Sequence, residues 1–492
     1  MQALLFPLVP LVPAACGLLC ALPPFKVRRP RDGFVLFALI AALGLTLWLC
    51  LTGNGSRTLF TLGASLPMAA RSDGVSRLFA LLVAGMWLVA GVFSFGYFAH
   101  DPAPRRYFAF YLLTEGALLA LCFSGTLVTM YLCFETMTLC SVPLVLHNRT
   151  REAVAGALKY LLYSIAGAMM GLFGIFFFTV HSASPFFQAG GTLTGAAVSG
   201  QGGTLLWVLL ITVIGFSTKA GMFPMHGWLP TAHPVAPGPA SAVLSGVIVK
   251  SGVLCVLRVL YYVVGADTFR GSWAQTVLLT LALVTVFMGS MLALAEKNLK
   301  KRLAYSTVSQ VSYILFGLFV ANEVAVTGAL LHVWFHSIAK TALFLCAGAV
   351  ILQTGKTRTD ELRGVGKRMP VTMWCFTLAG IALVGIPPLS GFVSKWFLAK
   401  GALGADIGVF SWLGPVVLLV SALLTAAYLL PVSITAFFPG MDARALAAAY
   451  PRGEAGRAML LSMIALAALT VLLGVWPAPL QGAIAGITAL IS

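Results

Sequence analysis

The amino-acid sequence predicts an all-α membrane protein that crosses the bilayer many times. Of its 492 residues, 60% are hydrophobic and only 9% are charged, whereas soluble domains carry about 25% charged residues. The mean hydropathy is +0.97. The apolar residues gather in about fourteen segments, each near the ~20 residues that a helix needs to cross a bilayer.

Each expected span is an apolar run bounded by charged, Gly-rich or Pro-containing loops. In the N-terminal half the spans are Ala3–Leu22, Gly33–Leu51, Arg77–Phe98, Tyr107–Phe123, Leu127–His147, Ala153–His181 and Leu205–Leu229. In the C-terminal half they are Ala240–Val264, Gln275–Ala295, Leu303–Ala321, Val326–Gln353, Val371–Ala399, Val409–Phe438 and Met459–Trp476, with a short apolar tail to Ser492. The first span has no basic segment before it and no small-residue cleavage site, so we expect a retained helix.

Two of these spans contain helix-breaking prolines. Pro224 lies in Leu205–Leu229, and the pair Pro387-Pro388 lies in Val371–Ala399. A proline inside a spanning helix leaves a carbonyl that another group must satisfy. We therefore expect both helices to be broken, and both breaks to line a cavity inside the protein rather than lipid.

The charged residues predict the orientation of the chain. The net charge is +17, but most of the 31 Lys and Arg lie in short loops between apolar segments, which argues against nucleic-acid binding. These loops are Lys26–Arg31, Arg105-Arg106, Arg149–Arg151, Lys297–Arg302, Lys356–Arg368 and Arg444–Arg457. The loop Ser182–Thr204 is uncharged. The positive-inside rule then places the basic loops in the cytoplasm and both termini on the outer side of the cell inner membrane.

The cysteines and the short motifs predict no cofactor in this chain. The nine cysteines lie in or beside apolar segments, and no two are spaced as CxxC, so we interpret them as buried apolar residues rather than metal or iron–sulfur ligands. The sequence also has no dinucleotide fingerprint, P-loop or HExxH motif. Any redox chemistry that this protein serves is therefore expected in partner subunits.

Ionisable side chains inside the expected spans mark the candidate site, because a lysine at bilayer depth costs roughly 2.5–3.5 kcal/mol. The basic ones are Lys159, Lys219, Lys250, Arg258, Lys340 and Lys395, and the acidic ones are Glu115 and Glu135. Arg258 is expected to reach the outer surface along its flexible stem, and Lys159 has the same option at the cytoplasmic side. Glu115 is expected either to be a local counter-charge or to face the outer surface.

The stretch Gly215–Ser251 concentrates such residues. It holds Lys219 and Lys250 within apolar runs, with His226, His233 and several prolines between them. Ion transporters place their sites on broken helices near the bilayer midplane. This stretch is therefore expected to line a hydrated cavity.

The same stretch carries a resemblance to a known family. The segment STKAGMFPMHGWLPTAHPVAPGPASAVLSGVIVKSG resembles the signature of the proton-conducting antiporter-like subunits of respiratory complex I, Mrp-type cation/proton antiporters and membrane-bound hydrogenases. Four further segments resemble the same family: FETMTLCSVPLVL, NLKKRLAYSTVSQVSYILFGL, HSIAKTALFLCAGAV and GIPPLSGFVSKWFLAKGAL. The resemblance covers roughly Tyr107–Lys400.

The resemblance implies two inverted five-helix repeats, each with one broken helix, in which the site lies at the repeat interface. The expected division is residues 1–106 for the first three helices, 107–264 for the first repeat, 265–438 for the second repeat, and 439–492 for the last helix and tail.

The resemblance also implies roles for ionisable residues. Glu135 and Lys219 match the family's switch pair, in which an opposite charge stabilises the ionised forms. Lys250 matches its central lysine. Lys395 matches the lysine that ends the conduction path.

Spacing adds a further set, because His332, His336 and Lys340 recur every four residues and so share one helix face. Such a row can pass a proton through intervening water. The predicted proton-translocating residues are therefore Glu135, Lys219, Lys250, His332, His336, Lys340 and Lys395. Auxiliary candidates are Lys159, His226, Tyr305 and Ser309.

Three functions fit these expectations. The first is a proton-translocating subunit of a redox-driven complex, whose partner subunits hold the redox cofactors. The second is a D-like subunit of a multisubunit Na⁺/H⁺ antiporter without redox chemistry. The third, an inactive scaffold, is disfavoured by the complete row of ionisable residues. The first two imply other membrane subunits, further antiporter-like subunits and lipid as partners, and protons, with sodium as the alternative, as the ion.

Overall fold

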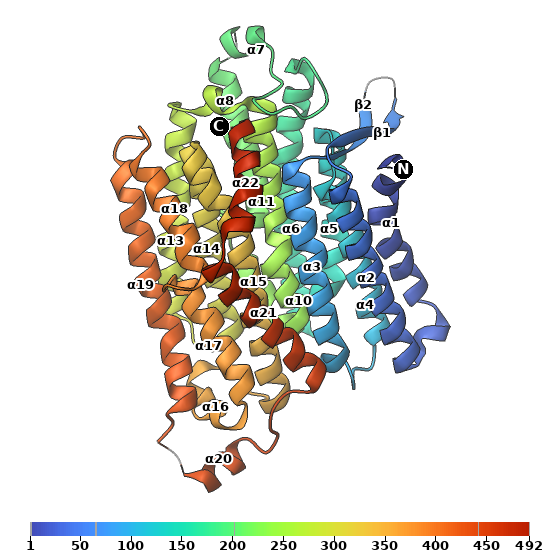
Figure 1. Ribbon diagram of the computed structural model, residues 1–492, viewed down its shortest axis with the longest axis vertical. Coiled ribbons are helices and arrows are strands. Elements are labelled where there is room, and N and C mark those ends of the chain that lie inside the picture. The colour runs from blue at the N-terminus through green and yellow to red at the C-terminus, as the bar shows by residue number, and fades with distance from the viewer. Residues whose placement is uncertain (1, 64–65, 201, 441, 492) are drawn as a thin grey trace.

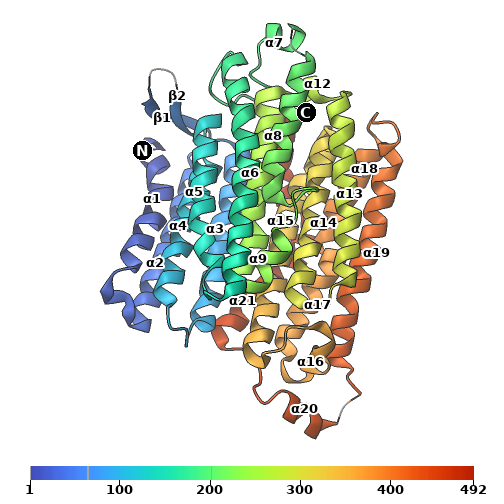
Figure 2. The same ribbon diagram turned by 180° about the vertical axis from the view of Figure 1, so that it is seen from behind.

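The helices lie side by side in a broad bundle that runs from α1 (Gln2–Cys20) at one edge to α19 (Phe410–Phe437) at the other (Figures 1 and 2). The computed structural model describes residues 2–63, 66–200, 202–440 and 442–491. Both ends of the described chain lie toward the end of the bundle that carries α7 (Gly195–Gly200), away from α16 (Val365–Arg368) and α20 (Ala443–Ala449) (Figure 1).

The remaining elements of the first half are η1 (Pro23–Lys26), α2 (Arg28–Leu51), β1 (Gly55–Leu62), β2 (Leu66–Ser72), α3 (Gly74–Tyr97), α4 (Pro104–Cys122), α5 (Leu127–Val145), α6 (Arg151–His181), α8 (Gly202–Ala220), α9 (Leu229–Val235), α10 (Gly238–Val243), η2 (Leu244–Ile248), α11 (Val249–Val259), η3 (Leu260–Val264) and α12 (Ala266–Phe269). The second half adds α13 (Trp273–Ala295), α14 (Leu299–Val320), α15 (Glu323–Thr354), η4 (Thr359–Leu362), α17 (Pro370–Val384), α18 (Ser390–Leu403), α21 (Arg457–Val475) and α22 (Ala478–Ile491). The helices α21 and α22 cross the face formed by α3 and α15 (Figure 1).

The predicted fold class is confirmed. Every predicted span contains a helix. Among the described residues, 11 helices are long and apolar enough to cross a membrane, and shorter apolar helices lie at Leu5–Cys20, Pro370–Val384 and Ala478–Leu490. The chain is therefore a membrane protein with many spans, whereas the number of spans, the inverted repeats and the division at residues 106, 264 and 438 remain predictions.

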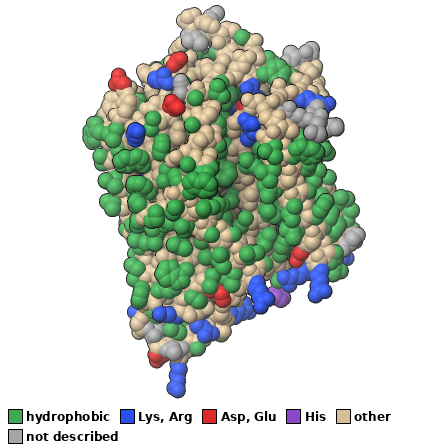
Figure 3. Space-filling view, viewed as in Figure 1, with side chains coloured by type: hydrophobic (Ala, Val, Ile, Leu, Met, Phe, Trp, Pro, Cys, Tyr) green, Lys and Arg blue, Asp and Glu red, His purple; other side chains and the backbone are tan. Residues whose placement is uncertain are grey.

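The surface has the charge distribution that the loops predict. A broad band of hydrophobic side chains covers the middle of the molecule, and Lys and Arg side chains gather mainly at the end that carries α16 and α20 (Figure 3). We call this end the basic face. An apolar band between polar ends is the surface that a bilayer requires.

A β-hairpin precedes α3, where the sequence predicted only a loop. Strand β1 pairs antiparallel with β2, from Gly55 opposite Ser72 to Leu62 opposite Leu66, with an irregularity between Thr58 and Phe60. The hairpin ends directly before Asp73, whose side chain accepts a hydrogen bond from the Ser76 N–H and so caps α3.

The prediction that Arg258 reaches the outer surface is wrong. Its side chain is 1% exposed and donates to both carboxylate oxygens of Asp73, at 2.7 and 2.8 Å, and to Ser76 Oγ at 2.9 Å. The rings of Phe187 and Tyr262 lie against the guanidinium. A buried guanidinium is tolerated when its donors are paired in this way. The ion pair links Asp73, which follows the hairpin, to α11.

Replacing Asp73 with asparagine is expected to destabilise the fold by about 3–5 kcal/mol, because it leaves Arg258 as a buried charge without a counter-charge. The measurement is the thermal unfolding midpoint of the detergent-purified protein. Asp267→Asn is the matched control, since Asp267 pairs with Arg270 but its side chain is 94% exposed, and exposed pairs contribute at most about 1 kcal/mol. Equal midpoints for the two variants would contradict the structural role of the buried pair.

Both predicted breaks are present. Helix α8 ends at Ala220 and α9 begins at Leu229, so Pro224 lies in the gap, and α17 ends at Val384 before the gap that contains Pro387. A glycine with a positive φ opens each gap, Gly221 at +80° and Gly385 at +91°, a conformation that residues with a Cβ rarely adopt.

Candidate functional site

The first break places Lys219 among hydroxyl groups. Lys219 lies in the last turn of α8 and is 1% exposed. Its Nζ donates to Thr138 Oγ1 at 2.8 Å, to Tyr160 Oη at 2.9 Å and to Ser164 Oγ at 3.0 Å. Since an ammonium has three donors, all three protons have protein acceptors.

Glu135 does not contact Lys219 directly. It is half-buried on α5, three residues before Thr138, and the described residues show no ion pair between it and Lys219 within 4.0 Å. One of its carboxylate oxygens, Oε1, is buried and has no hydrogen-bond partner in the described part of the chain. Glu135 therefore lies about one turn of α5 from Thr138, which accepts a hydrogen bond from Lys219, and the predicted pair is not joined by a hydrogen bond.

A close helix contact joins the Lys219 region to Lys250. A Cβ at Gly252 would lie 2.5 Å from Phe216 O and 3.0 Å from Lys219 Cβ, so only glycine lets α11 approach α8 this closely. The π-helical turn η2 precedes Lys250, and such turns are frequent at functional sites.

Lys250 of α11 contacts α15 in the second half of the chain. It is 1% exposed, and its Nζ lies 2.7 Å from Ser245 O and 2.7 Å from His336 Nδ1 on α15. The predicted contact between the central lysine and the face of α15 is therefore present in the structure.

The face of α15 continues from His336 in both directions. The His332 and His336 rings stack with centroids 5.8 Å apart, and His332 Nδ1 lies 2.9 Å from Ser394 Oγ on α18. In the other direction, Lys340 Nζ donates to Leu303 O at 3.0 Å. All three ionisable side chains are buried, as the spacing of four residues predicted.

Lys395 lies at the second break. Its Nζ donates to the carbonyls of Leu383 and Val384, at 2.8 and 2.9 Å, which are the last two of α17. Carbonyls at a helix C-terminus lack intrahelical partners and carry partial negative charge, so they stabilise a cation. The same Nζ lies 5.1 Å from the centre of the Tyr313 ring, which stacks on His332.

Two of the auxiliary candidates lie beside the first break. Lys159 is half-buried with its Nζ 5.9 Å from the Tyr163 ring, and both side chains approach Gly227 in the gap. His226, in the same gap, stacks on Phe223 with ring centroids 6.0 Å apart. Lys159 and His226 therefore flank the gap that follows Lys219.

The other two auxiliary candidates lie apart from the ionisable row. Ser309 bonds with Ser290 Oγ at 2.9 Å and Ser421 Oγ at 3.1 Å, in a serine cluster between α13, α14 and α19. Tyr305 is half-buried. Within the described part of the chain, neither residue forms a hydrogen bond with the lysines or histidines of the row.

Two further buried ionisable residues lie outside the predicted proton-translocating set. His233 on α9 is fully buried and stacks on Phe344 of α15 with ring centroids 4.7 Å apart. Lys300 is buried, and its Nζ donates to Ala236 O at 2.6 Å. His233 belongs to the quoted signature stretch. Lys300 belongs to the expected basic loop Lys297–Arg302, so its burial was not predicted.

We define the central row as Lys219, Lys250, His336, His332 and Lys395, with Lys340 and His233 as its branch toward the basic face. Several buried polar atoms along it have no hydrogen-bond partner in the described part of the chain: Ser217 Oγ, both nitrogens of His233, Gln310 Oε1 and Nε2, His332 Nε2, His336 Nε2 and Thr341 Oγ1. Buried polar atoms are normally satisfied, and water is the usual partner where protein supplies none. The row thus has the unpaired buried donors and acceptors that water occupies in proteins.

Glu115 fits neither of its two predicted settings. It is fully buried on α4, where it packs against α1, so it does not face the outer surface. Neither carboxylate oxygen has a hydrogen-bond partner among the described residues, and no ion pair is formed there.

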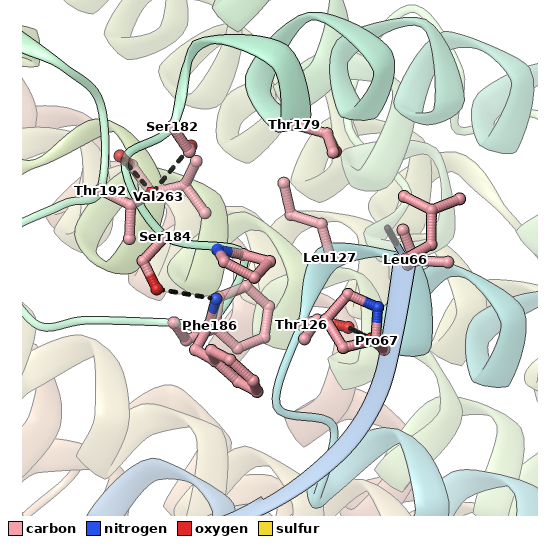
Figure 4. Close-up of a pocket in the computed structure, with 13 residues that line it drawn as sticks. Leu66, Pro67, Thr126, Leu127, Thr179, Ser182, Ser184, Phe186, Thr192 and Val263 are labelled. Carbon is pink, nitrogen blue, oxygen red and sulfur yellow. Dashed lines mark hydrogen bonds between the residues drawn. The ribbon is translucent and has the colours of Figure 1, made fainter. Parts of the chain in front are cut away.

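The pocket in Figure 4 lies elsewhere. Thr126 and Leu127 at the start of α5, Pro67 of the hairpin and Phe186 of the loop after α6 line it. It contains none of the predicted site residues.

The comparisons with known proteins agree with this geometry. The family described as NADH:quinone oxidoreductase/Mrp antiporter, TM, matches residues 124–425. A second family, described as NADH-ubiquinone oxidoreductase (complex I), chain 5 N-terminus, matches residues 60–108. NADH-quinone oxidoreductase subunit N of Desulforudis audaxviator is 35% identical over 364 residues, which are 73% of this chain and 71% of the relative. The D-type subunit of the Na(+)/H(+) antiporter of Bacillus subtilis is 30% identical over 393 residues, 78% of this chain and 77% of the relative.

Solved structures share the fold. A chain of the membrane-bound sulfane sulfur reductase, an archaeal respiratory membrane complex, superposes with a TM-score of 0.85 at 21% identity, covering 100% of this chain and 98% of that one. A chain of the Mrp complex from Dietzia gives 0.83 at 22% identity, covering 99% and 97%. Since the family match spans most of the chain and includes the row from Lys219 to Lys395, this protein belongs to the NADH:quinone oxidoreductase/Mrp antiporter transmembrane family.

Proposed function

We propose that this chain is a proton-translocating membrane subunit of a multisubunit complex and that redox chemistry in partner subunits drives it. The observation that carries the proposal is the buried row of basic side chains that links the two broken helices through the 2.7 Å contact between Lys250 and His336. A fixed structural charge would be paired with an acid, whereas Lys219, Lys250 and Lys395 bond to neutral oxygen or nitrogen acceptors. Neutral acceptors leave each lysine free to release its proton.

Release of a proton from Lys219 is the controlled step of the proposed path. When Glu135 is ionised, its charge stabilises the protonated form of Lys219 across the turn that separates them; when Glu135 is protonated, the desolvation of the buried lysine favours proton release. The proton then moves through water to Lys250, along His336 and His332, and to Lys395 at the second break.

A second candidate is a D-like subunit of a multisubunit Na⁺/H⁺ antiporter without redox chemistry. The observation in its favour is the similarity to the D-type antiporter chain of Bacillus subtilis, over 77% of that protein. The same row serves both functions, with sodium as an alternative ion. In either case we propose that the chain lies in the cell inner membrane, with the basic face toward the cytoplasm and both termini outside.

Both candidates place the chain among other membrane subunits, including further antiporter-like subunits, and assign any redox cofactor to those partners. The deciding experiment is purification of the intact complex in mild detergent and its reconstitution into proteoliposomes. Proton transport that requires an electron donor and acceptor identifies the redox-driven complex. Transport that follows an imposed Na⁺ gradient alone identifies the antiporter, and a fully active isolated chain would contradict both.

Replacing Glu135 with glutamine is expected to impair proton pumping more than it impairs assembly. The substitution removes the charge that acts on Lys219 and keeps the side-chain volume. Proton flux into proteoliposomes, normalised to the amount of assembled complex, measures the effect. Glu152→Gln is the control, since Glu152 is an exposed acid on the first turn of α6; unchanged flux in Glu135→Gln would assign Glu135 to structure alone.

A further inference from the structure

A polar cavity opens at the basic face, away from the two helix breaks. It lies between the ends of α3 and α15, the loop after α3 and the chain that enters α21, and has a volume of about 740 Å³. Its polar and charged lining residues are Tyr97, His100, Asp101, Asn148, Gln353 and Arg452. We call this cavity the vestibule. Since water occupies about 30 Å³ per molecule, the vestibule has room for many water molecules.

A carboxylate and a buried imidazole lie together at the wall of the vestibule. His147, just after α5, is 4% exposed, and its Nε2 lies 3.2 Å from both carboxylate oxygens of Asp101. Its other nitrogen, Nδ1, is buried and has no partner among the described residues. The rings of Phe98 and Tyr107 pack edge-on against the imidazole. Nε2 of His147 is therefore hydrogen-bonded to Asp101 of the vestibule, and Nδ1 has no partner among the described residues.

Charged groups of both signs surround His147. Asp101 faces its Nε2, and Arg106 donates to its main-chain carbonyl. Asp101 thus supplies a negative charge on a face that is otherwise rich in Lys and Arg and repels cations (Figure 3).

Closely packed residues of α10 and α15 lie between the vestibule and the branch of the central row. The Tyr97 ring packs against Gly238 of α10 and Gly348 of α15, where an added Cβ would lie 3.1 and 3.6 Å from Tyr97 Cε2. From Gly348, α15 passes Phe344, on which His233 stacks, and reaches Lys340 after eight residues, about 12 Å. Lys340 of the branch therefore lies about 12 Å along α15 from Gly348, which contacts the Tyr97 ring of the vestibule.

We propose that the vestibule is the site at which this chain takes up protons from the basic face, with Asp101 and His147 as its proton-binding residues. A hydronium ion gives its proton to this pair and becomes water, and the pair passes the proton through water beside Tyr97 to His233 and Lys340. This inference rests on the proposed function, because it assigns the source of the protons that the central row carries.

The test is proton flux by the whole complex in proteoliposomes with Asp101→Asn. Asparagine keeps an oxygen for the hydrogen bond that Asp101 Oδ1 accepts from the Ala103 N–H at 2.8 Å, so the loop is expected to keep its conformation. Flux is expected to fall several-fold and to recover in Asp101→Glu. Glu152→Gln removes an acid from the same face outside the vestibule and is expected to leave flux unchanged. Unchanged flux in Asp101→Asn, or an equal loss in Glu152→Gln, would overturn the proposal.

A second measurement tests access rather than charge. Gln353→Cys places a thiol in the vestibule, and a membrane-impermeant cationic thiol reagent added at the basic face is expected to reduce flux, whereas Glu152→Cys treated in the same way is not. No effect of the reagent on modified Gln353→Cys would overturn the proposal. A Lys219→Arg complex measured in parallel distinguishes failure of the vestibule proposal from failure of the proposed function. If Lys219→Arg loses flux while both vestibule variants keep it, the vestibule proposal is wrong and the proposed function stands.

Discussion

Replacing Lys219 with arginine is expected to abolish proton flux through this chain while the complex still assembles. Arginine keeps the positive charge but stays protonated up to about pH 12, so it cannot release a proton to the next group. A static ion pair would tolerate the exchange, because only the charge would matter. The measurement is proton flux in proteoliposomes, normalised to assembled complex.

The surroundings of Lys219 provide a matched control. Ser164→Ala removes one of the three hydroxyl acceptors, at 3.0 Å, and leaves those of Thr138 and Tyr160. It is expected to retain most of the flux, since two of the three acceptors remain and Lys219 can still release its proton. Normal pumping by Lys219→Arg would show that the lysine is structural and that the proposed path is wrong.

The sequence predicted the parts of the site that depend on local chemistry. Pro224 and Pro387 lie in the two breaks as predicted, whereas Pro143 and Pro431 lie inside the continuous helices α5 and α19. A proline therefore marks a candidate break, and the resemblance to the family selected these two. The spacing of His332 and His336 revealed their common face because helical periodicity is likewise local. Composition alone was enough for the fold class.

What the sequence did not reveal depends on contacts between distant segments. The burial of Arg258 needs Asp73, whose position after a short hairpin 185 residues earlier is set by tertiary pairing. His233 becomes part of the branch only because α9 packs against α15, and Lys300 is buried only because the start of α14 meets Ala236 after α9. The separation of Glu135 from Lys219 depends on side-chain placement within one turn, which spacing cannot resolve.

Removing either partner of the Lys250–His336 contact is expected to abolish flux, and removing both is expected to cost no more than removing one. The two nitrogens are 2.7 Å apart, and two positive charges at that distance repel by about 6 kcal/mol even at an effective dielectric constant of ~20. The pair therefore holds one proton at a time. Arrival of a proton on Lys250 requires a neutral His336, and transfer to His336 leaves a neutral Lys250.

In the proposed path the two groups act as a single carrier, so we expect the effects of their removal to be non-additive. Lys250→Met and His336→Phe keep approximate volume and remove the titratable atom, and the double variant completes the cycle. His181→Phe is the control, since His181 lies at the far end of α6 and bonds to its own helix through Phe177 O. A shared proton is supported if the flux of the double variant equals that of either single variant. If the flux loss of the double variant is the product of the two single losses, Lys250 and His336 serve separate steps and the proton does not pass between them.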